Sequence, residues 1–348
     1  MNWGAQLQAY ALKKAIEEEN FQVEQIDHRE MKTNLYRKIN SVSTLVGNVI
    51  AYLTRNQLLT RIERTKKWRD KHLSLSSPFR TKEEMLALNK KYDIFVTGSD
   101  QVWNCTNGIN PNFYLDFVQD DSKKNAYAAS FGIKNIPAAY RNLVAERLKR
   151  YNHISVRESS GKEIIRQECD IEVECVCDPV FLLSADIWRN AIVKSSELQL
   201  SKMEKYIFVY STQMGKEFIK LVFQIKKAYQ LPVVSVSWIP GCTVVKDLGP
   251  AEFVDYIMNA EVVVTTSFHA TAFSIIFEKN FYVMPHSTTG NRVTDILDKL
   301  DLKTHIIDKS WNGEQIRADY IKSKELLRDY AESSKAFLRA ILNEREIL

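Results

Sequence analysis

The stretch at residues 261–277 constrains the fold of this chain more than any other part of the sequence. Three consecutive valines at 262–264 predict a short buried strand. The hydroxyl residues at 265–267 are of the types that cap helices, and apolar residues then recur at helical spacing up to Phe277. A strand followed by a tight turn and a helix is the repeating unit of an α/β fold. Free backbone N–H groups and the positive end of the helix dipole predict an anion site at this turn.

His269 lies at the mouth of the predicted anion site, among small and apolar neighbours. Its imidazole can hold or release a proton near neutral pH, which predicts an acid/base role beside a bound anion. The alternative interpretation is a histidine that only caps the helix or lies on the surface.

The composition limits the classes of function. A chain of 348 residues with 45% hydrophobic content is large enough for two domains. The chain is mildly basic, with a net charge of +5. Its pI of 8.7 lies below the value of about 9 that marks a nucleic-acid-binding domain. We therefore expect an anionic small molecule or an anionic membrane surface as partner, and no nucleic acid.

The sequence shows no apolar run near the roughly 20 residues of a transmembrane helix. Gln6 and Gln8 interrupt any signal-peptide core, so a cytoplasmic location is predicted. The five cysteines form no pair of CxxC motifs, which favours reduced thiols and no metal site.

The segment from Thr33 to His72 is predicted to be helical and is rich in lysine and arginine. We interpret it as a pair of helices with a solvated basic face. The alternative is an amphipathic surface that contacts the inner face of an anionic membrane or a lipid-linked acceptor.

Two successive series of alternating strands and helices divide the chain. They predict two doubly wound domains face to face, with a boundary after Ser184 and with their strand ends lining one cleft. Helix 4–20 and strand 21–26 would be half of such a unit, whose first strand should precede Asn2. The remaining strands are predicted at 92–97, 125–130, 154–156 and 172–177, and then at 206–210, 233–236, 262–264, 281–284 and 304–307.

Polar residues follow several of these strands, where open α/β sheets bind ligands. The turn from Gly98 to Asn104 offers two small residues for close backbone approach, the donors and acceptors Asp100 and Gln101, and Trp103 as a plate for a sugar ring. The alternative for this turn is an ordinary Asx turn.

Later strands end in further polar groups. Ser130 and Asp178 each close a strand, and Arg157 could hold a carboxylate or phosphate bidentately. The alternative role for Arg157 is an ion pair with Glu158 or another acid.

Several of these motifs together resemble the polysaccharide pyruvyl transferases over almost the whole chain. They are Asn2-Trp-Gly-Ala with Leu-Gln-Ala-Tyr-Ala-Leu12, Gly98-Ser-Asp-Gln-Val-Trp-Asn104, Ala128-Ala-Ser-Phe-Gly132, Ser155-Val-Arg-Glu158, Cys177-Asp-Pro-Val180, Gly249-Pro with Glu252-Phe, Thr266-Ser-Phe-His-Ala-Thr-Ala-Phe-Ser274, and Arg292 before a leucine-spaced helix.

The resemblance implies a glycosyltransferase-B-like fold of two Rossmann-like domains. These would cover 1–185, with a helical basic insert at about 33–90, and 186–315, while a helix at 316–348 packs back on the first domain. The resemblance also implies transfer of a pyruvyl group from phosphoenolpyruvate to a sugar, or to its lipid-linked oligosaccharide, as a cyclic ketal. No cofactor is expected beyond phosphoenolpyruvate as donor.

Family members with an Arg-Leu-His-Gly element use its Arg and His near phosphoenolpyruvate. Ser267 and Ala270 replace the first and last residues of that element here. The missing cation must then come from elsewhere, and Arg157 or Arg292 is the candidate.

The resulting hypothesis gives His269 the acid/base role and lets Asp100, or alternatively Asp178, accept a hydroxyl proton. The predicted substrate-binding residues are Asn2, Gly4, Gly98, Ser99, Gln101, Trp103, Asn104, Ser130, Arg157, Asp178, Thr266, Ser267, Phe268 and Arg292. Two alternatives stay open: a glycosyltransferase of the same architecture that uses a nucleotide sugar, and a non-catalytic glycan-binding component of a polysaccharide assembly complex.

Overall fold

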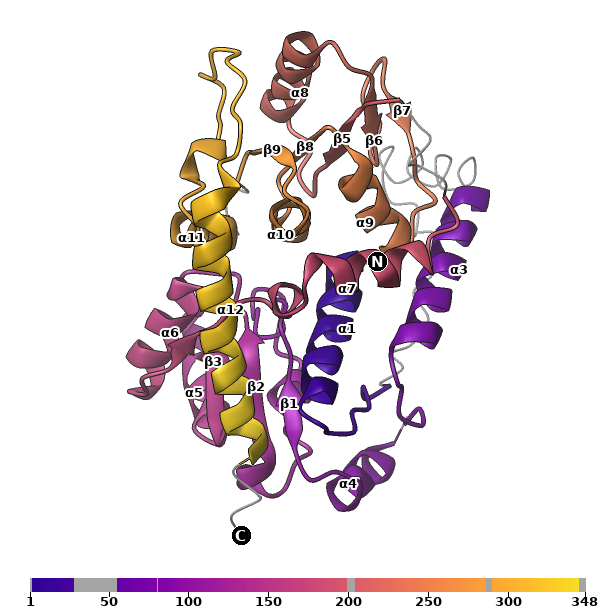
Figure 1. Ribbon diagram of the computed structural model, residues 1–348. Helices are drawn as coiled ribbons and strands as arrows, with labels where there is room; N and C mark the ends of the chain where they lie inside the picture. Colours follow the sequence, from indigo (N-terminus) through magenta and orange to yellow (C-terminus); the bar gives the residue numbers. More distant parts are fainter. Residues whose placement is uncertain (1, 28–54, 80, 199–203, 286–289, 344–348) are drawn as a thin grey trace, which may run out of the picture.

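Two parallel β-sheets form the framework of the computed structural model, which describes residues 2–27, 55–79, 81–198, 204–285 and 290–343 (Figure 1). The first sheet has the order β1-β2-β3-β4 and the second β7-β6-β5-β8-β9. The strands are β1 (Phe95–Thr97), β2 (Lys124–Ala129), β3 (His153–Val156), β4 (Glu174–Cys175), β5 (Ile207–Tyr210), β6 (Val233–Ser235), β7 (Thr243–Val244), β8 (Val262–Thr265) and β9 (Asn280–Val283). We call the parts around the two sheets the first and the second half.

Helices separate the strands in both halves, as expected for parallel sheets. They are α1 (Trp3–Glu18), α3 (Arg55–His72), α4 (Lys82–Lys91), α5 (Arg141–Leu148), α6 (Ser159–Cys169), α7 (Ala185–Val193), α8 (Lys216–Tyr229), α9 (Pro250–Asn259), α10 (Phe268–Ile276), α11 (Asn291–Lys299) and α12 (Tyr320–Asn343), with short 3-10 turns such as η4 (Pro179–Leu182) and η6 (Lys303–His305). Among the described helices, none is both long and apolar enough to span a bilayer.

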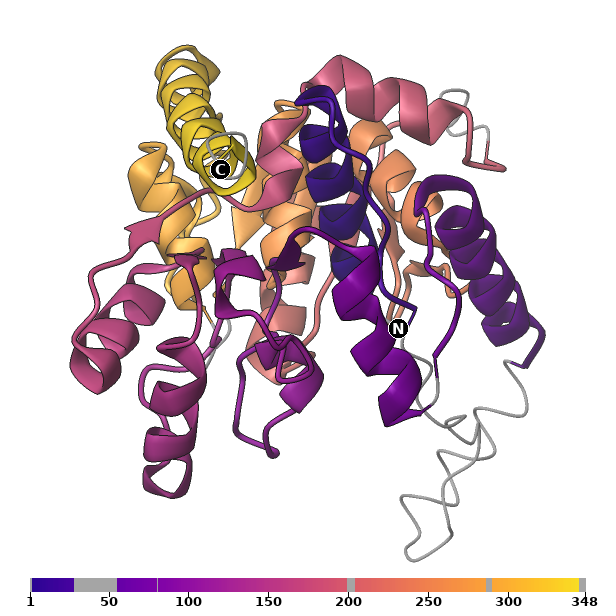
Figure 2. The same ribbon diagram turned by 90° about the horizontal axis from the view of Figure 1, so that it is seen from below.

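Helices cover both faces of the first sheet. Seen from below, α1 and α12 lie on one side of it and α5 and α6 on the other (Figure 2). Strand β2 is buried along its whole length, with Tyr127 packed in the core that contains α1 and Ala126 in the core that contains α5 and α6. Residues 126–129 of β2 supply the apolar and small side chains that a strand buried on both faces needs. Lys124, at the start of the strand, is also buried and forms an ion pair with Asp121 at 3.2 Å.

One hydrophobic core joins the two halves. It contains side chains of α1 and η4 from the first half and of α9 and α10 from the second. Helix α12 also connects them (Figure 1). At its start the Tyr320 hydroxyl donates to the Lys279 carbonyl at 2.6 Å, and past its middle the Ser334 hydroxyl accepts from the Cys177 amide at 2.9 Å.

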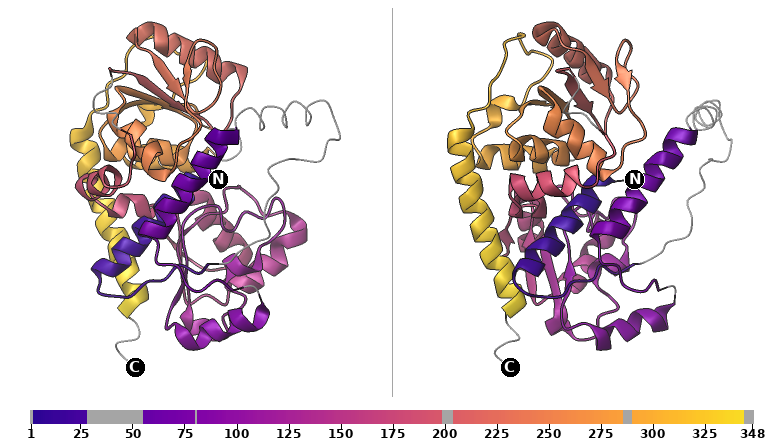
Figure 3. Two further views of the ribbon diagram at one scale, coloured as in Figure 1. Left: turned by 90° about the vertical axis from the view of Figure 1, so that its right-hand side faces the viewer. Right: turned by 45° about the vertical axis from the view of Figure 1, so that its right-hand side comes forward.

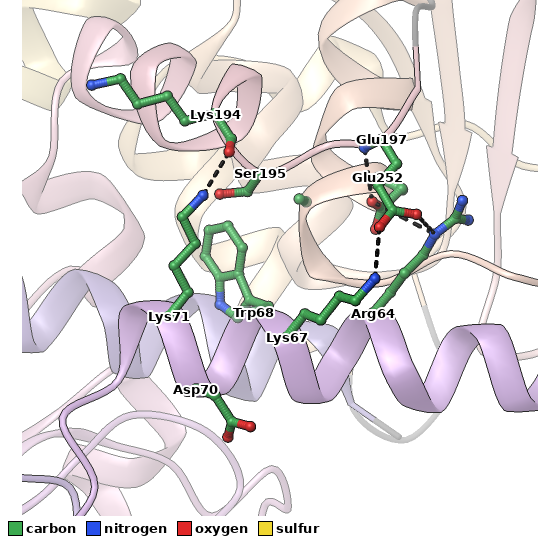
Figure 4. A pocket seen from close by; sticks show the side chains of 10 residues that line it. Arg64, Lys67, Trp68, Asp70, Lys71, Lys194, Ser195, Glu197 and Glu252 are labelled. Carbon is green, nitrogen blue, oxygen red and sulfur yellow. Dashed lines mark hydrogen bonds and ion pairs between the residues drawn. The ribbon is translucent and has the colours of Figure 1, made fainter.

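Helix α3 runs from the first half to the second (Figure 3). Arg64 bonds Asp247 at 2.8 Å and Glu197 at 3.2 Å, and the Lys71 ammonium donates to the Lys194 carbonyl at 2.6 Å. These contacts border a cavity of about 510 Å³ that Trp68 also lines (Figure 4).

The solvated basic face predicted for this region is wrong for Arg64, whose side chain is largely covered and reaches carboxylates of other elements. Lys66, Lys67 and Lys71 are exposed, as that prediction expects. The rest of the predicted basic segment, residues 33–54, lies outside the described residues.

Two predicted strands are absent from the described structure. Residues 21–26 contribute only a bridge from Gln25 to Leu75, and residues 304–307 only a bridge from Ile306 to Val283. His305 is buried in the turn η6, where its Nδ1 lies 2.8 Å from the Phe281 carbonyl. His305 also stacks on Phe281 of β9, so residues 304–307 pack on that strand as a turn and form no ladder with it. Conversely, the two-residue strand β7 was not predicted.

Candidate functional site

All four strands of the first sheet deliver polar side chains to the same edge. Ser99 follows β1, Ser130 follows β2, Arg157 follows β3 and Asp178 follows β4, and each is buried. The carboxyl ends of parallel strands meet at one edge of a sheet, so the prediction that these residues gather is explained by topology alone.

Arg157 and Asp178 form a buried ion pair. Arg157 Nη1 lies 2.5 Å from Asp178 Oδ2 and donates to the Ser99 hydroxyl at 3.0 Å, while that hydroxyl donates to the same carboxylate oxygen at 2.8 Å. Burial opposes charge on both groups, but the Asp178 carboxylate raises the pKa of Arg157 and the guanidinium lowers the pKa of Asp178. Both partners therefore stay charged at neutral pH.

His269 approaches this ion pair from the second half. It is the second residue of α10, which follows β8 after the turn at Thr266 and Ser267, and its Nε2 lies 3.7 Å from Asp178 Oδ2. Burial lowers the pKa of His269, and the positive charge of Arg157 adds to the effect, while the Asp178 carboxylate offsets it only in part. The imidazole is consequently neutral near pH 7.

The start of α1 closes the other side of the imidazole. Gly4 is packed so closely against the ring that a Cβ there would lie 2.0 Å from His269 Nδ1. Asn2 caps the helix through its side-chain oxygen and donates its amide to the Asp100 carboxylate at 2.6 Å. The structure thus brings Asn2, Gly4 and Asp100 next to the residues of the strand ends.

Glu158 is a member of the site that sequence reasoning named only as an alternative partner for Arg157. Its Oε1 accepts from the Ser130 hydroxyl at 2.8 Å and from the backbone amides of Phe131 and Gly132 at 3.1 and 3.3 Å. Its Oε2 lies 3.9 Å from Arg157 Nε, so Asp178 is the closer partner of that arginine. The sequence signal for this residue was an acidic side chain directly after the arginine that follows a predicted strand.

Arg292, in the first turn of α11, adds a second cation. Burial and the like charge of Arg157 lower its pKa to about 10. Asp295, one turn further along α11, accepts from the backbone amide and the hydroxyl of Ser159 at 2.9 and 2.7 Å. This contact fixes α11 against the start of α6 in the first half.

Several buried polar atoms around the two arginines have no hydrogen-bond partner in the described part of the chain. They are Arg157 Nε and Nη2, His269 Nε2, Glu158 Oε2 and Arg292 Nε. Leaving a buried donor unpaired costs about 1–3 kcal/mol, and more for a charged group. Such a cluster of unpaired polar atoms is typical of a ligand site, and three of its residues, Arg157, His269 and Arg292, carry or can carry positive charge.

The other predicted residues have structural roles. Trp103 is fully buried, stacks on Tyr114 and donates its indole N–H to the Phe113 carbonyl at 3.2 Å, so its predicted role as a plate for a sugar ring is wrong. An aromatic residue beside a polar turn resembles a sugar platform in sequence, but the same ring also fills a core. Asn104 accepts from the Thr106 amide within its own turn.

The residues before His269 support the turn. The Thr266 hydroxyl accepts from the Thr212 amide at 3.1 Å, and the Phe268 ring centroid lies 4.5 Å from the Arg157 guanidinium. Ser267 is at the N-cap of α10 without a side-chain cap bond. Gly98 lies against Leu12, and Gln101 packs beside Gly132.

In the residues the structure describes, no group of three or more His, Cys, Asp or Glu side chains is placed to hold a metal ion.

Comparison with known families decides the class of protein. The model of the polysaccharide pyruvyl transferase family matches residues 2–288. The chain belongs to this family. The family match includes every predicted site residue except Arg292, and it places the protein among transferases that act on polysaccharides. A search of curated proteins finds no match.

Solved structures show only distant similarity to this chain. A protein assigned as UDP-N-acetylglucosamine 2-epimerase from Listeria monocytogenes aligns at a TM-score of 0.48 with 12% identity, covering 95% of this chain and 94% of that one. The wall teichoic acid polymerase TagF aligns at a TM-score of 0.33 with 10% identity, covering 83% and 92% of the two chains. At such scores these similarities carry no argument about function.

Proposed function

We propose that this pyruvyl transferase moves the pyruvyl group of phosphoenolpyruvate to a sugar of a surface polysaccharide or its lipid-linked precursor. The product is a cyclic ketal, phosphate is released, and the reaction takes place in the cytoplasm between two Rossmann-like domains of a glycosyltransferase-B-like arrangement. The observation that carries the proposal is the approach of His269 from the second half to within 3.7 Å of Asp178 in the first, beside the buried Arg157.

The charges of the site suit phosphoenolpyruvate, which carries a carboxylate and a phosphate on a small frame. Arg157 has two unpaired donor nitrogens and Arg292 has one, so together they can hold both anionic groups. The first N–H groups of α10 add a partial positive charge. An anion between the two arginines would also relieve their mutual repulsion, which lowers the pKa of Arg292 in the free site.

Ketal formation from phosphoenolpyruvate begins at the methylene carbon. A proton added to the methylene carbon makes C2 electrophilic, and a sugar hydroxyl adds there and loses its own proton. The C2–O bond to phosphate then breaks with its electron pair on the leaving oxygen, and a second sugar hydroxyl adds to C2. Two protons are released by the two hydroxyls. One returns to the acid that protonated the carbon, and the other leaves on the phosphate.

In this scheme His269 delivers the proton to carbon. The imidazole is neutral in the free site because burial lowers its pKa, but a bound phosphate would raise that pKa and charge the ring together with the substrate. Asp178 positions Arg157 and faces the imidazole, since its Oδ2 already accepts from Arg157 and Ser99. Its carboxylate is therefore less suited to accept a sugar proton.

Asp100 is the better candidate for that base. Its backbone has φ of 104°, in the left-handed region that costs free energy for a residue with a side chain. Asn2 and the Gln101 amide each donate to one of its carboxylate oxygens. The carboxylate is thus held in a fixed orientation beside the site, and it is only partly buried, so a sugar can reach it.

The proposal is tested by His269→Gln, which keeps a polar side chain but cannot carry the proton. Phosphate release from phosphoenolpyruvate in the presence of a sugar acceptor is measured together with the mass gain of the ketal on the acceptor. We expect turnover to fall by about two to four orders of magnitude while phosphoenolpyruvate still binds. Near-normal turnover would remove His269 from the chemistry, and glycan binding without any phosphate release by the unmodified protein would favour a non-catalytic role.

A further inference from the structure

A second cavity lies at the carboxyl ends of β5 and β6, outside the site around His269. Its volume is about 540 Å³, within the usual range for a small-molecule site. Tyr210 and Thr212 line it from the end of β5, and Trp238 and Lys246 from the segment after β6. Leu58 and Arg61 of α3 also line it, so the cavity lies between α3 and the second half.

The chemistry of the lining suits an anionic ligand that carries an apolar or aromatic group. Among the described lining residues are two cations, Arg61 and Lys246, and no carboxylate. Trp238 leaves 71% of its surface exposed beside this cavity, although a tryptophan on a soluble protein is normally well covered. An exposed aromatic ring next to positive charge is a common platform for a sugar or a base attached to phosphate.

The cavity adjoins elements that support the proposed catalytic site. The Arg61 guanidinium lies 4.4 Å from the Trp3 ring centroid, and Trp3 directly precedes the Gly4 that packs on His269. From the other direction, the Thr212 amide donates to Thr266, three residues before His269. A ligand in the cavity therefore lies next to the elements that hold the imidazole.

We propose that this cavity binds the diphosphate of a glycosyl diphosphate acceptor, with its sugar directed toward His269. The inference rests on the proposed function, because it names the form in which the sugar arrives. Lys246 and Arg61 take the phosphates, and Trp238 packs against the group that the diphosphate carries. That group is a polyprenyl chain in a lipid-linked acceptor and a nucleoside in a nucleotide-linked one.

Fluorescence of Trp238 offers a direct test. The tryptophans at 3, 68, 103 and 188 are buried and Trp311 is partly covered, so a ligand in the cavity should change mainly the emission of Trp238. The probes are N-acetylglucosamine linked to farnesyl diphosphate, the same sugar linked to uridine diphosphate, and its methyl glycoside without phosphate. We expect a saturable change with at least one diphosphate and none with the methyl glycoside at the same concentration.

Lys246→Ala should weaken binding of that diphosphate by roughly ten- to hundredfold, the loss expected for one charged hydrogen bond. Lys227→Ala, on exposed α8 and outside the lining, is the matched control and should bind as the unmodified protein does. Trp238→Phe should remove the fluorescence signal but leave binding detectable by calorimetry. Binding of phosphoenolpyruvate should be the same in all three variants.

Preference for the farnesyl probe would support a lipid-linked acceptor, and preference for the uridine probe a nucleotide-linked one. Binding of phosphoenolpyruvate without saturable binding of either diphosphate, or equal affinity in Lys246→Ala and the unmodified protein, would overturn the inference and leave the proposed function intact. Binding of a diphosphate without phosphoenolpyruvate would instead contradict the proposed function, and the cavity would then be a donor site of a glycosyltransferase.

Discussion

At the scale of single residues, the proposed chemistry depends on a charge arrangement that burial alone would not permit. Asp178 keeps Arg157 charged in the interior, and the same carboxylate lies 3.7 Å from His269. Removing one partner of such a pair leaves an uncompensated buried charge, at a cost of about 3–5 kcal/mol. The pair therefore fixes the site structurally as well as chemically.

Gly4→Ala tests how tightly the imidazole is positioned. In the interior of a helix this change normally stabilises by about 1 kcal/mol, but here the new Cβ would lie 2.0 Å from His269 Nδ1. We expect a lower melting temperature and a loss of kcat larger than any rise in the KM for phosphoenolpyruvate, because the ring must move. Gly215→Ala, where a Cβ meets open space, is the matched control. Unchanged kcat in Gly4→Ala would contradict this account of the ring's position.

Sequence reasoning located the acidic, basic and hydroxyl residues of the strand ends, because parallel topology places them together without further information. It could not foresee which of their hydrogen bonds are used internally. Ser130 serves Glu158 and Trp103 serves the core, and both facts depend on packing between residues far apart in the sequence. The contact between Gly4 and His269 joins residues that are far apart in the sequence, and neither local sequence predicts it.

At the scale of elements, α3 shows how a basic helix can be used inside a molecule. Arg64 bonds carboxylates of the second half, and His72 near the end of the helix lies 2.7 Å from the Ser195 hydroxyl. The His72 ring also lies 4.0 Å from the Trp68 ring, which packs in the core shared by the two halves. Docking of α3 therefore links the halves through both charge and apolar contact.

The His72 contact predicts a dependence of stability on pH. Burial, with the nearby charge of Lys71, lowers the pKa of His72 to about 4 from 6.5. As the pH falls, the imidazole is protonated in the unfolded chain before it is protonated in the folded protein. The stability that depends on a neutral His72 is therefore fully present above pH 6.5 and is lost as the pH falls toward 4. We expect the free energy of unfolding to fall by roughly 1–3 kcal/mol more in the unmodified protein than in His72→Gln over this interval.

Urea unfolding at pH 7 and pH 4.5 measures this difference, and comparing the two proteins cancels the titration of groups they share. Parallel losses of stability in the unmodified protein and His72→Gln would show that His72 is not responsible.

The order of strands and helices was largely predictable because the apolar runs of β5, β8 and α8 leave little choice of period. The short segments were not. Residues 21–26 and 304–307 are predicted as strands, but each forms only a single bridge to a neighbour. Pairing over a few residues depends on what lies alongside, which a single sequence does not contain.

At the scale of the whole molecule, the two halves meet where their strand ends carry complementary groups. The first half supplies Arg157 and Asp178, and the second supplies His269 and Arg292. A shared core, α3 and α12 hold the halves in contact, so the site is assembled by the fold before any substrate arrives. Preorganised charge of this kind is what stabilises developing charge in a transition state.

The most direct measurement of the central claim is calorimetric titration of phosphoenolpyruvate into the unmodified protein and into Arg292→Met. This substitution removes a cation without exposing an unpaired carboxylate, which a change at Arg157 would do, and Arg317→Met on the exposed surface is its control. We predict saturable binding of one phosphoenolpyruvate per chain, unchanged in Arg317→Met and weakened roughly ten- to hundredfold in Arg292→Met. The absence of saturable binding, or equal affinity in all three proteins, would contradict the claim that the two halves together bind an enol phosphate.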